Sequence, residues 1–256
     1  PRPAAAGSRL WSRLFKPEQP ETPFRFAKQL VGIIDTLPTR QQRHFPELKD
    51  PVFWKFYHLC SPFSLVHVTG FYNVFQSIRH VAANTLPGDI VECGCFLGGV
   101  TGFLRLCCRH FGIAGKTIVV FDTFTGFTPG EKDIYMGKEQ IGTQFDSFRN
   151  AFEINMREIT GGLDYIRIVQ GPVESTLQGS EIQDVCLIRL DTDYYSSTRT
   201  ELQTLYPKLV PGGVLIVDDY GMFDGSRRAT DEYIAGLDSK PLLNRIDIGI
   251  WSGVKP

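Results

Sequence analysis

Residues 185–193 read VCLIRLDTD, a short apolar run that is followed at once by two aspartates. A strand without polar alternation is buried on both faces of its sheet, which is typical of a parallel sheet covered by helices. A helical pattern follows over residues 197–208, where Thr198 and Glu201 have the spacing of a capping box. The stretch therefore predicts one strand and helix unit of an α/β fold.

The same alternation of apolar runs and helical patterns continues along most of the chain. Further strands are predicted at residues 90–93, 118–121, 166–169 and 214–217, with helices at 64–85, 100–111 and 226–235. The last stretch, 243–254, predicts one or two closing strands that pair antiparallel. Residues 1–60 are rich in proline and charge and then irregularly apolar, which predicts a tail with accessory helices before one domain at 61–256.

Composition excludes several classes of protein. The 256 residues are 42% hydrophobic and 21% charged, with a formal net charge of -1, so no basic field favours nucleic acid. Six irregularly spaced cysteines fit neither a disulfide framework nor a zinc ribbon, which favours a reducing, cytoplasmic compartment. No apolar run is long enough to predict a membrane span. The apolar N-terminal part favours a homo-oligomer, in the simplest case a dimer.

Several predicted strands end in acidic residues. In open α/β sheets the ligand crevice lies outside the carboxyl ends of the strands, so these side chains are expected to meet at one edge. Their number favours a ligand site over the alternative, in which each acid caps a helix or pairs with Arg227 or Arg228. The acids are Glu92, Asp122, Asp191, Asp218 and Asp219.

The turn after the first predicted strand reads ECGCFLGG over residues 92–99, an E-x-G-x-x-x-G pattern. Glycines there permit a tight turn and let a ligand lie against bare backbone. The pattern differs from the dinucleotide fingerprint G-x-G-x-x-G, and Asp122 ends the next strand, where an acid can accept both hydroxyls of a ribose. A ribose site without a phosphate site favours S-adenosylmethionine, and NAD is the weaker interpretation.

The aspartates after the last two parallel strands predict a metal site. In extended geometry Asp191 and Asp193 face the same side. Asp218 and Asp219 can share one ion only if the chain turns as it leaves the sheet, which the following Tyr220-Gly221 allows. Carboxylates without histidine or thiolate select magnesium, calcium or manganese, and magnesium is expected.

The chain from about Phe63 onward resembles the macrocin O-methyltransferase (TylF) family, which methylates sugar hydroxyls during macrolide and aminocoumarin antibiotic synthesis. The resemblance rests on five segments that keep the family's order and cover about three quarters of the chain. They are GDIVECGCFLGG, VVFDTFTGF, LIRLDTDYYSSTRTELQTLYPKL, PGGVLIVDDYG and SRRATDEY.

This resemblance implies a seven-stranded Rossmann-like sheet of the class I methyltransferases, with helices on both faces and a helical N-terminal extension. It implies S-adenosylmethionine as cofactor and magnesium held by Asp191, Asp218 and Asp219. Asp193 would then be the general base that removes the proton of the acceptor hydroxyl.

The resemblance also assigns the cofactor contacts. The methionine end and the ribose would be held by Glu92, Gly94 and Asp122, while Val173 and Glu174 would lie beside the adenine. The remaining contacts of this cofactor set are Cys95, Gly98 and Asp191.

The acceptor is expected to be a small molecule, a sugar or a glycosylated natural product. Residues 123–143 carry glycine, proline and mixed charge, as a mobile lid over an acceptor does. A catechol-type enzyme is an alternative, although such enzymes usually carry a lysine shortly after the paired aspartates, where Tyr194-Tyr195 stand here. The pattern also leaves open a cofactor-binding scaffold without activity and an NAD-dependent oxidoreductase.

Overall fold

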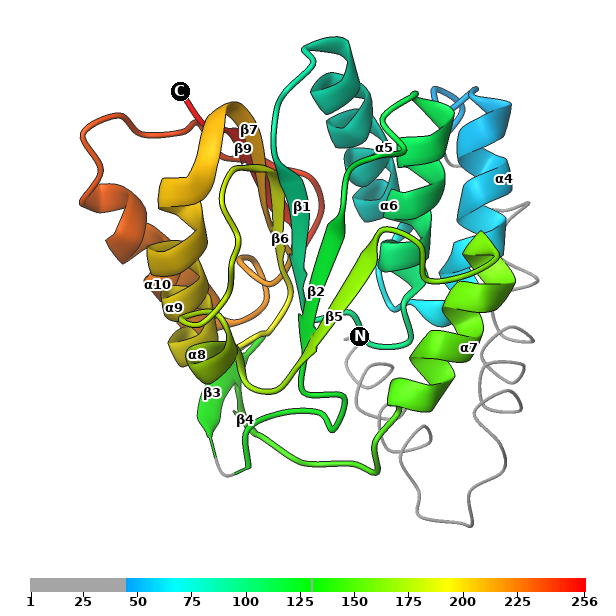
Figure 1. Cartoon of the computed structure of the whole chain (residues 1–256). Helices are drawn as coiled ribbons and strands as arrows, with labels where there is room; N and C mark the ends of the chain where they lie inside the picture. The colour runs from blue at the N-terminus through cyan, green and yellow to red at the C-terminus, as the bar shows by residue number, and fades with distance from the viewer. Residues whose placement is uncertain (1–44, 130) are drawn as a thin grey trace.

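The computed structural model describes residues 45–129 and 131–256, in which a seven-stranded sheet lies between two layers of helices (Figure 1). The strand order is β5-β2-β1-β6-β7-β9-β8. The first five of these strands are parallel, and β9 and β8 close the sheet antiparallel, as the sequence predicted. The strands are β1 (Asp89–Cys93), β2 (Ile118–Asp122), β5 (Ile166–Gln170), β6 (Val185–Leu190), β7 (Leu209–Val217), β8 (Asn244–Arg245) and β9 (Trp251–Val254).

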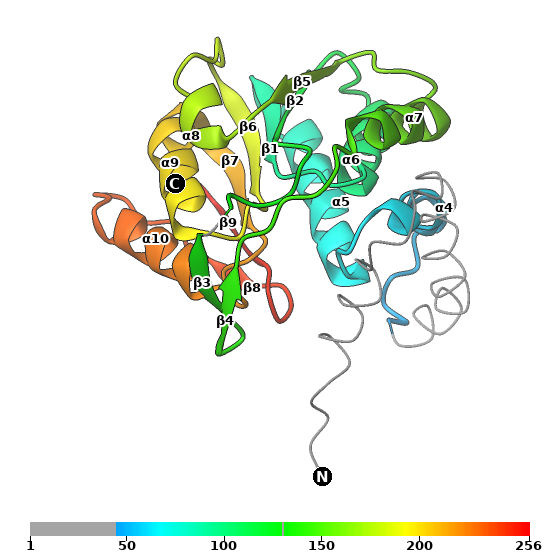
Figure 2. The same cartoon turned by 90° about the horizontal axis from the view of Figure 1, so that it is seen from below.

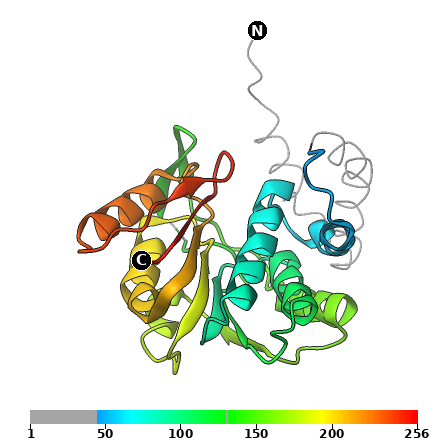
Figure 3. The ribbon, with the colours of Figure 1, turned by 90° about the horizontal axis from the view of Figure 1, so that it is seen from above.

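Helices cover both faces of the sheet, and Figures 2 and 3 show the two layers from below and from above. The first layer contains α4 (Pro51–Cys60), α5 (Val68–Ala83), α6 (Gly99–His110) and α7 (Arg149–Thr160). The second contains α8 (Val173–Thr176), α9 (Tyr195–Leu205) and α10 (Asp224–Ala235). Each layer packs on the apolar strands through its own core, so the predicted class and the predicted helices on both faces are confirmed.

Helix α4 belongs to the first of these cores. Asp50 caps its start by accepting from the Val52 N–H at 2.8 Å, and the wholly buried Phe53 lies edge-on against Phe75 of α5 and Phe103 of α6. The predicted division at residue 60 therefore falls just after a helix that packs into the sheet domain. The rest of the predicted tail, residues 1–44, lies outside the described residues.

No helix within the described residues combines the length and the apolar character that a membrane span requires. All six cysteines lie in the described part of the chain, where they are buried and unpaired, as the irregular spacing predicted.

A hairpin beyond the carboxyl edge of the sheet is the main element that the strand pattern did not predict. It consists of β3 (Lys132–Tyr135) and β4 (Lys138–Ile141) and lies within the predicted lid. In Figures 1 and 2 the hairpin lies beneath the strand ends, beside α10. The Met136 N–H donates to the Met222 carbonyl at 2.8 Å, and the Gly225 N–H donates to Asp133 Oδ1 at 2.9 Å.

The capping box predicted at Thr198 is wrong. Helix α9 begins at Tyr195, and the Thr198 N–H already donates to the Tyr194 carbonyl at 3.1 Å, which is a bond of the first helical turn. Glu201 consequently lies in the body of the helix, where its side chain is fully buried and accepts from the Thr192 hydroxyl at 2.9 Å.

Candidate active site

The glycine turn between β1 and α6 is shaped by packing within the protein. Gly94 and Gly98 have φ values of 80° and 89°, the left-handed region that favours glycine. A Cβ on Gly94 would collide with the Asp191 carbonyl, and a Cβ on Gly98 would meet the side chains of Phe152 and Met156 in α7. The glycines thus bring the turn against the end of β6, next to the aspartates.

Asp122 at the end of β2 holds this turn in place. Its Oδ2 accepts from the N–H groups of Cys95 at 2.7 Å and Phe96 at 3.2 Å, and its Oδ1 accepts from the Phe124 N–H at 2.7 Å. A carboxylate offers about four acceptor positions. Three are filled here by backbone, and the ribose contact of Asp122 remains a prediction.

The segment predicted beside the adenine lies next to Asp122. The Gly171 N–H donates to the Asp122 carbonyl at 2.9 Å, which carries the chain directly into α8 with its buried Val173. Glu174 is partly exposed and accepts from the Ser196 hydroxyl at 3.2 Å. The turn, Asp122 and α8 therefore line one continuous edge, and their contacts with the cofactor remain a prediction.

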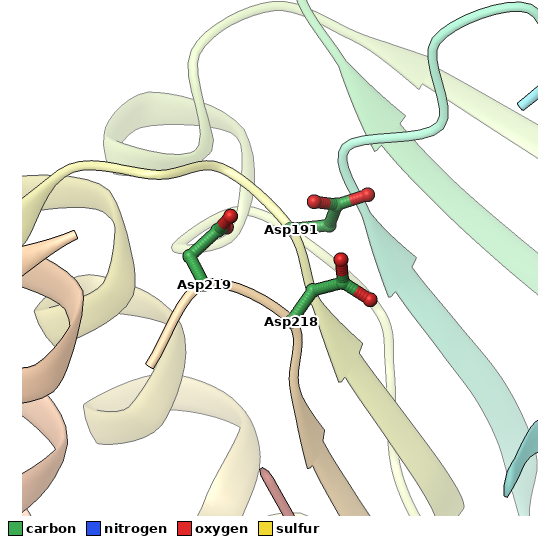
Figure 4. A group of neighbouring side chains, drawn as sticks. All are labelled: Asp191, Asp218 and Asp219. Atoms are coloured by element: carbon green, nitrogen blue, oxygen red, sulfur yellow. The ribbon is translucent and has the colours of Figure 1, made fainter. Parts of the chain in front are cut away.

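Asp191, Asp218 and Asp219 come together at the ends of β6 and β7 (Figure 4). Each offers an oxygen within 4.8 Å of the other two. Strand β7 stops at Val217, and the chain then turns, because the Met222 N–H donates to the Asp219 carbonyl at 3.0 Å. The turn that the sequence required for shared binding by the two adjacent aspartates is present.

The two arginines considered as partners of these acids are engaged elsewhere. Arg227 pairs with Asp224 within α10, and Arg228 lies 3.7 Å from Glu232 one helical turn away. The prediction of a ligand site is therefore favoured over simple pairing with these two arginines.

Asp193 reaches the aspartates by a different geometry from the one expected. The chain leaves β6 at Leu190, and Asp193 has a φ of 68°, so the extended alternation assumed for Asp191 and Asp193 is wrong. Aspartate tolerates the left-handed region better than most residues. In this conformation the Asp193 N–H donates to Asp219 Oδ2 at 3.1 Å, which places Asp193 beside the cluster.

Arg189 is the site residue that the sequence analysis missed. It is 1% exposed, and its guanidinium donates to Glu92 at 3.0 Å, Asp191 at 2.7 Å and Asp218 at 2.8 Å. The available signal was a single charged residue inside an otherwise apolar strand, because a buried charge requires partners.

The acidic groups at this edge outnumber the one arginine that pairs with them. Burial raises the pKa of Asp218 against the lowering effect of Arg189, and burial together with Asp191 raises the pKa of Asp193. The pKa of Asp219 is raised further, by burial and then by Asp193 and the other two aspartates. Among the described residues Arg189 makes every ion pair of this cluster. An oxygen donor set with excess negative charge fits a hard divalent cation such as magnesium.

Glu92 lies beneath the glycine turn. Its carboxylate is fully buried and accepts from the Thr101 hydroxyl on one oxygen and from Arg189 on the other. Burial raises its pKa to about 7, although Arg189 and Thr101 lower it. In this conformation Glu92 supports the turn from inside, and it has no exposed surface to offer the predicted methionine end of the cofactor.

Glu201 is a second buried acid, behind the loop that carries Asp191 and Asp193. Its Oε1 accepts from the Thr192 hydroxyl, and the buried Cys93 thiol lies against the same carboxyl group. Burial raises the pKa of Glu201 to about 8. The protonated form is therefore favoured in the folded protein.

The Glu201→Gln variant is expected to gain stability over the wild type as pH rises. Because the pKa is raised from about 4.3 in unfolded chains, the stabilising contribution of protonated Glu201 is complete below about pH 4 and is lost as pH rises through about 8. Glutamine keeps the Thr192 bond without ionising. Thermal unfolding with EDTA between about pH 6 and about pH 9 measures the difference in melting temperature, with the exposed Glu158→Gln as control. A difference that stays constant with pH would contradict the assigned protonation.

The residues of the site all lie within the part of the chain that matches a known protein family. The model of the family described as macrocin O-methyltransferase (TylF) matches residues 62–252. Demethyldecarbamoylnovobiocin O-methyltransferase of Streptomyces niveus is 33% identical over 180 residues, which are 68% of this chain and 69% of that protein. An 8-demethyl-8-(2,3-dimethoxy-alpha-L-rhamnosyl)-tetracenomycin-C 4'-O-methyltransferase of Streptomyces olivaceus is 29% identical over 182 residues, with 68% and 69% covered.

A solved structure, that of the O-methyltransferase NovP, superposes on this fold with a TM-score of 0.67 at 29% identity. The superposition covers 75% of this chain and 82% of the NovP chain. The residues matched by the family model include the glycine turn and every acid of the site. The chain therefore belongs to the macrocin O-methyltransferase (TylF) family and is an S-adenosylmethionine-dependent O-methyltransferase.

Proposed function

We propose that this enzyme transfers the methyl group of S-adenosylmethionine to a hydroxyl group of a sugar or glycosylated natural product, with a divalent cation held by Asp191, Asp218 and Asp219. The observation that carries the proposal is the meeting of three carboxylates within 4.8 Å at the strand ends, beside the glycine turn. The name of the Streptomyces olivaceus relative, which specifies a rhamnosyl compound, supports a sugar as the acceptor.

The chemistry of the site divides between proton removal and positioning. A bound divalent cation would lower the pKa of the acceptor hydroxyl, and the cofactor would supply the methyl group. Asp193 would accept the hydroxyl proton on its carboxylate as the new O–C bond forms and the S–C bond to the methyl group breaks, with S-adenosylhomocysteine as the leaving group. Its position suits this task, because its backbone N–H holds it against Asp219, beside the aspartates that would bind the cation.

The β3–β4 hairpin is proposed to contact the acceptor through Tyr135. This ring packs against Phe223, with ring centroids 4.9 Å apart. Phe223 directly follows the turn that begins at Asp219. Burial and the charges of Asp193 and Asp219 raise the pKa of the Tyr135 hydroxyl, so that hydroxyl lies within the field of the site. The hydroxyl donates to Met222 Sδ at 3.9 Å, and an oxygen of the acceptor would replace this sulfur as a stronger hydrogen-bond acceptor.

Methyl transfer from radiolabelled S-adenosylmethionine tests the proposal, with demethyldecarbamoylnovobiocin and a panel of related glycosides as acceptors, in magnesium or in EDTA. We expect magnesium-dependent transfer to a sugar hydroxyl. Tyr135→Phe should raise KM for the acceptor up to about tenfold with little change in kcat, because one hydrogen bond contributes about 1 kcal/mol. Lys138→Ala, opposite Tyr135 in the hairpin, is the control. A protein that binds neither S-adenosylmethionine nor magnesium by calorimetry refutes the proposal.

A further inference from the structure

Arg189 occupies a central position between the two parts of the site. It lies on β6, which pairs with β1 on one side and β7 on the other, and Glu92 is its register partner in β1. The guanidinium uses two nitrogens for four acceptors. Nη1 donates to Glu92 Oε1 at 3.0 Å and to the Gly94 carbonyl at 3.4 Å, while Nη2 donates to Asp191 Oδ2 at 2.7 Å and Asp218 Oδ1 at 2.8 Å.

These bonds fall into two sets. Nη1 binds only the residues at the start of the glycine turn, and Nη2 binds only aspartates of the cation cluster. A guanidinium is planar and rigid, so the directions of its N–H groups are fixed relative to each other. The orientation of the Arg189 guanidinium plane therefore fixes the position of the glycine turn relative to Asp191 and Asp218.

The bonds on the cluster side also determine which oxygens are available. Nη2 engages one oxygen of Asp191 and one of Asp218, which fixes the rotation of both carboxylates. Each of the two carboxylates keeps a second oxygen that Arg189 does not contact. Partners that orient ligands in this way typically change metal affinity about 10- to 100-fold when they are removed.

We propose that Arg189 is a positioning residue that couples the cofactor turn to the cation-binding aspartates, so that each ligand binds more tightly when the other is present. The inference rests on the proposed function, since it takes the cation to lie at Asp191, Asp218 and Asp219. Couplings between two sites of one protein typically change affinity about 5- to 150-fold.

The test measures binding without turnover. Manganese affinity is determined by electron paramagnetic resonance with and without S-adenosylhomocysteine, for the wild type and for Arg189→Lys. Lysine keeps the positive charge but lacks the planar set of N–H donors. The variant therefore separates the positioning of the acids from their electrostatic attraction to a positive charge. Arg105→Lys is the matched control. Arg105 is also buried, at 3% exposure, but its Nη1 donates to the Ala114 carbonyl at 2.6 Å, away from the strand ends.

We expect tighter manganese binding in the presence of S-adenosylhomocysteine for the wild type and for Arg105→Lys. Arg189→Lys should weaken manganese binding about tenfold or more, and its coupling factor should fall toward one. Unchanged affinity and coupling in Arg189→Lys would overturn the proposal, as would a wild type that binds both ligands independently. A wild type that binds neither ligand refutes the proposed function instead, so the two failures are distinct.

If Arg189→Lys does not fold, a second variant tests the coupling through Arg189. Glu92→Gln keeps the size of the side chain and weakens the Nη1 bond on the turn side, because it removes the charge that Arg189 contacts, while both Nη2 bonds to the aspartates are kept. Reduced coupling between manganese and S-adenosylhomocysteine supports the proposal, and coupling equal to that of the wild type overturns it.

Discussion

Asp193→Asn is expected to lower kcat by about 100- to 10,000-fold, the range that a positioned general base contributes. The affinity for S-adenosylhomocysteine should stay close to that of the wild type, and the affinity for magnesium should change far less than kcat, because the backbone bond that holds Asp193 against Asp219 is kept although the charge beside Asp219 is removed. The expected loss therefore lies in the chemical step.

Single-turnover methyl transfer with saturating cofactor and cation measures this effect, and calorimetry measures the two affinities. Asp224→Asn is the control, because Asp224 is an acid at the start of α10 that pairs with Arg227 on the surface. Wild-type turnover in Asp193→Asn would remove Asp193 as the base.

Asp219→Asn is expected to reduce activity at least about 100-fold through loss of the cation, and to change stability in two opposite ways. Magnesium at 100 times its Kd should stabilise the wild type by about 2.7 kcal/mol and the variant far less. Without a cation the variant should be the more stable protein near pH 8. The raised pKa of Asp219 means that its stabilising protonated form is lost as pH rises, and asparagine avoids this cost.

Chemical denaturation at about pH 8, in EDTA and in magnesium, measures both differences. Glu158→Gln, an exposed acid on α7, controls for the removal of one negative charge. An Asp219→Asn protein that magnesium stabilises as much as the wild type would show that the cation lies elsewhere.

The sheet was predictable because buried parallel strands have a simple signature. Four of the five parallel strands agree within one residue at each end with their apolar runs, for example Ile90 to Cys93 within β1, and the acids at their ends lie at the expected edge. Strand β7 extends further toward its N-terminal end than predicted, over Leu209–Val217, through a segment rich in glycine.

The local geometry of the site was less predictable, because it depends on contacts between distant residues. The left-handed φ of Asp193 follows its bond to Asp219, 26 residues later, and no pattern around Asp193 indicates it. Glu201 has the right spacing for a capping box, yet burial beneath Thr192 determines its place. The β3–β4 hairpin lacks an apolar face of its own and is held mainly by α10 and the turn before it.

The pairing of Glu92 with Arg189 also has a consequence for how the chain folds. These residues are 97 positions apart and lie opposite each other in neighbouring parallel strands. A slip of one residue would place the guanidinium on the other face, against the apolar layer, and leave an unpaired charge in the interior. The ion pair therefore selects the correct register when β1 meets β6. Since pairing over such separations is slow, the joining of β1 to β6 should be a slow step of refolding.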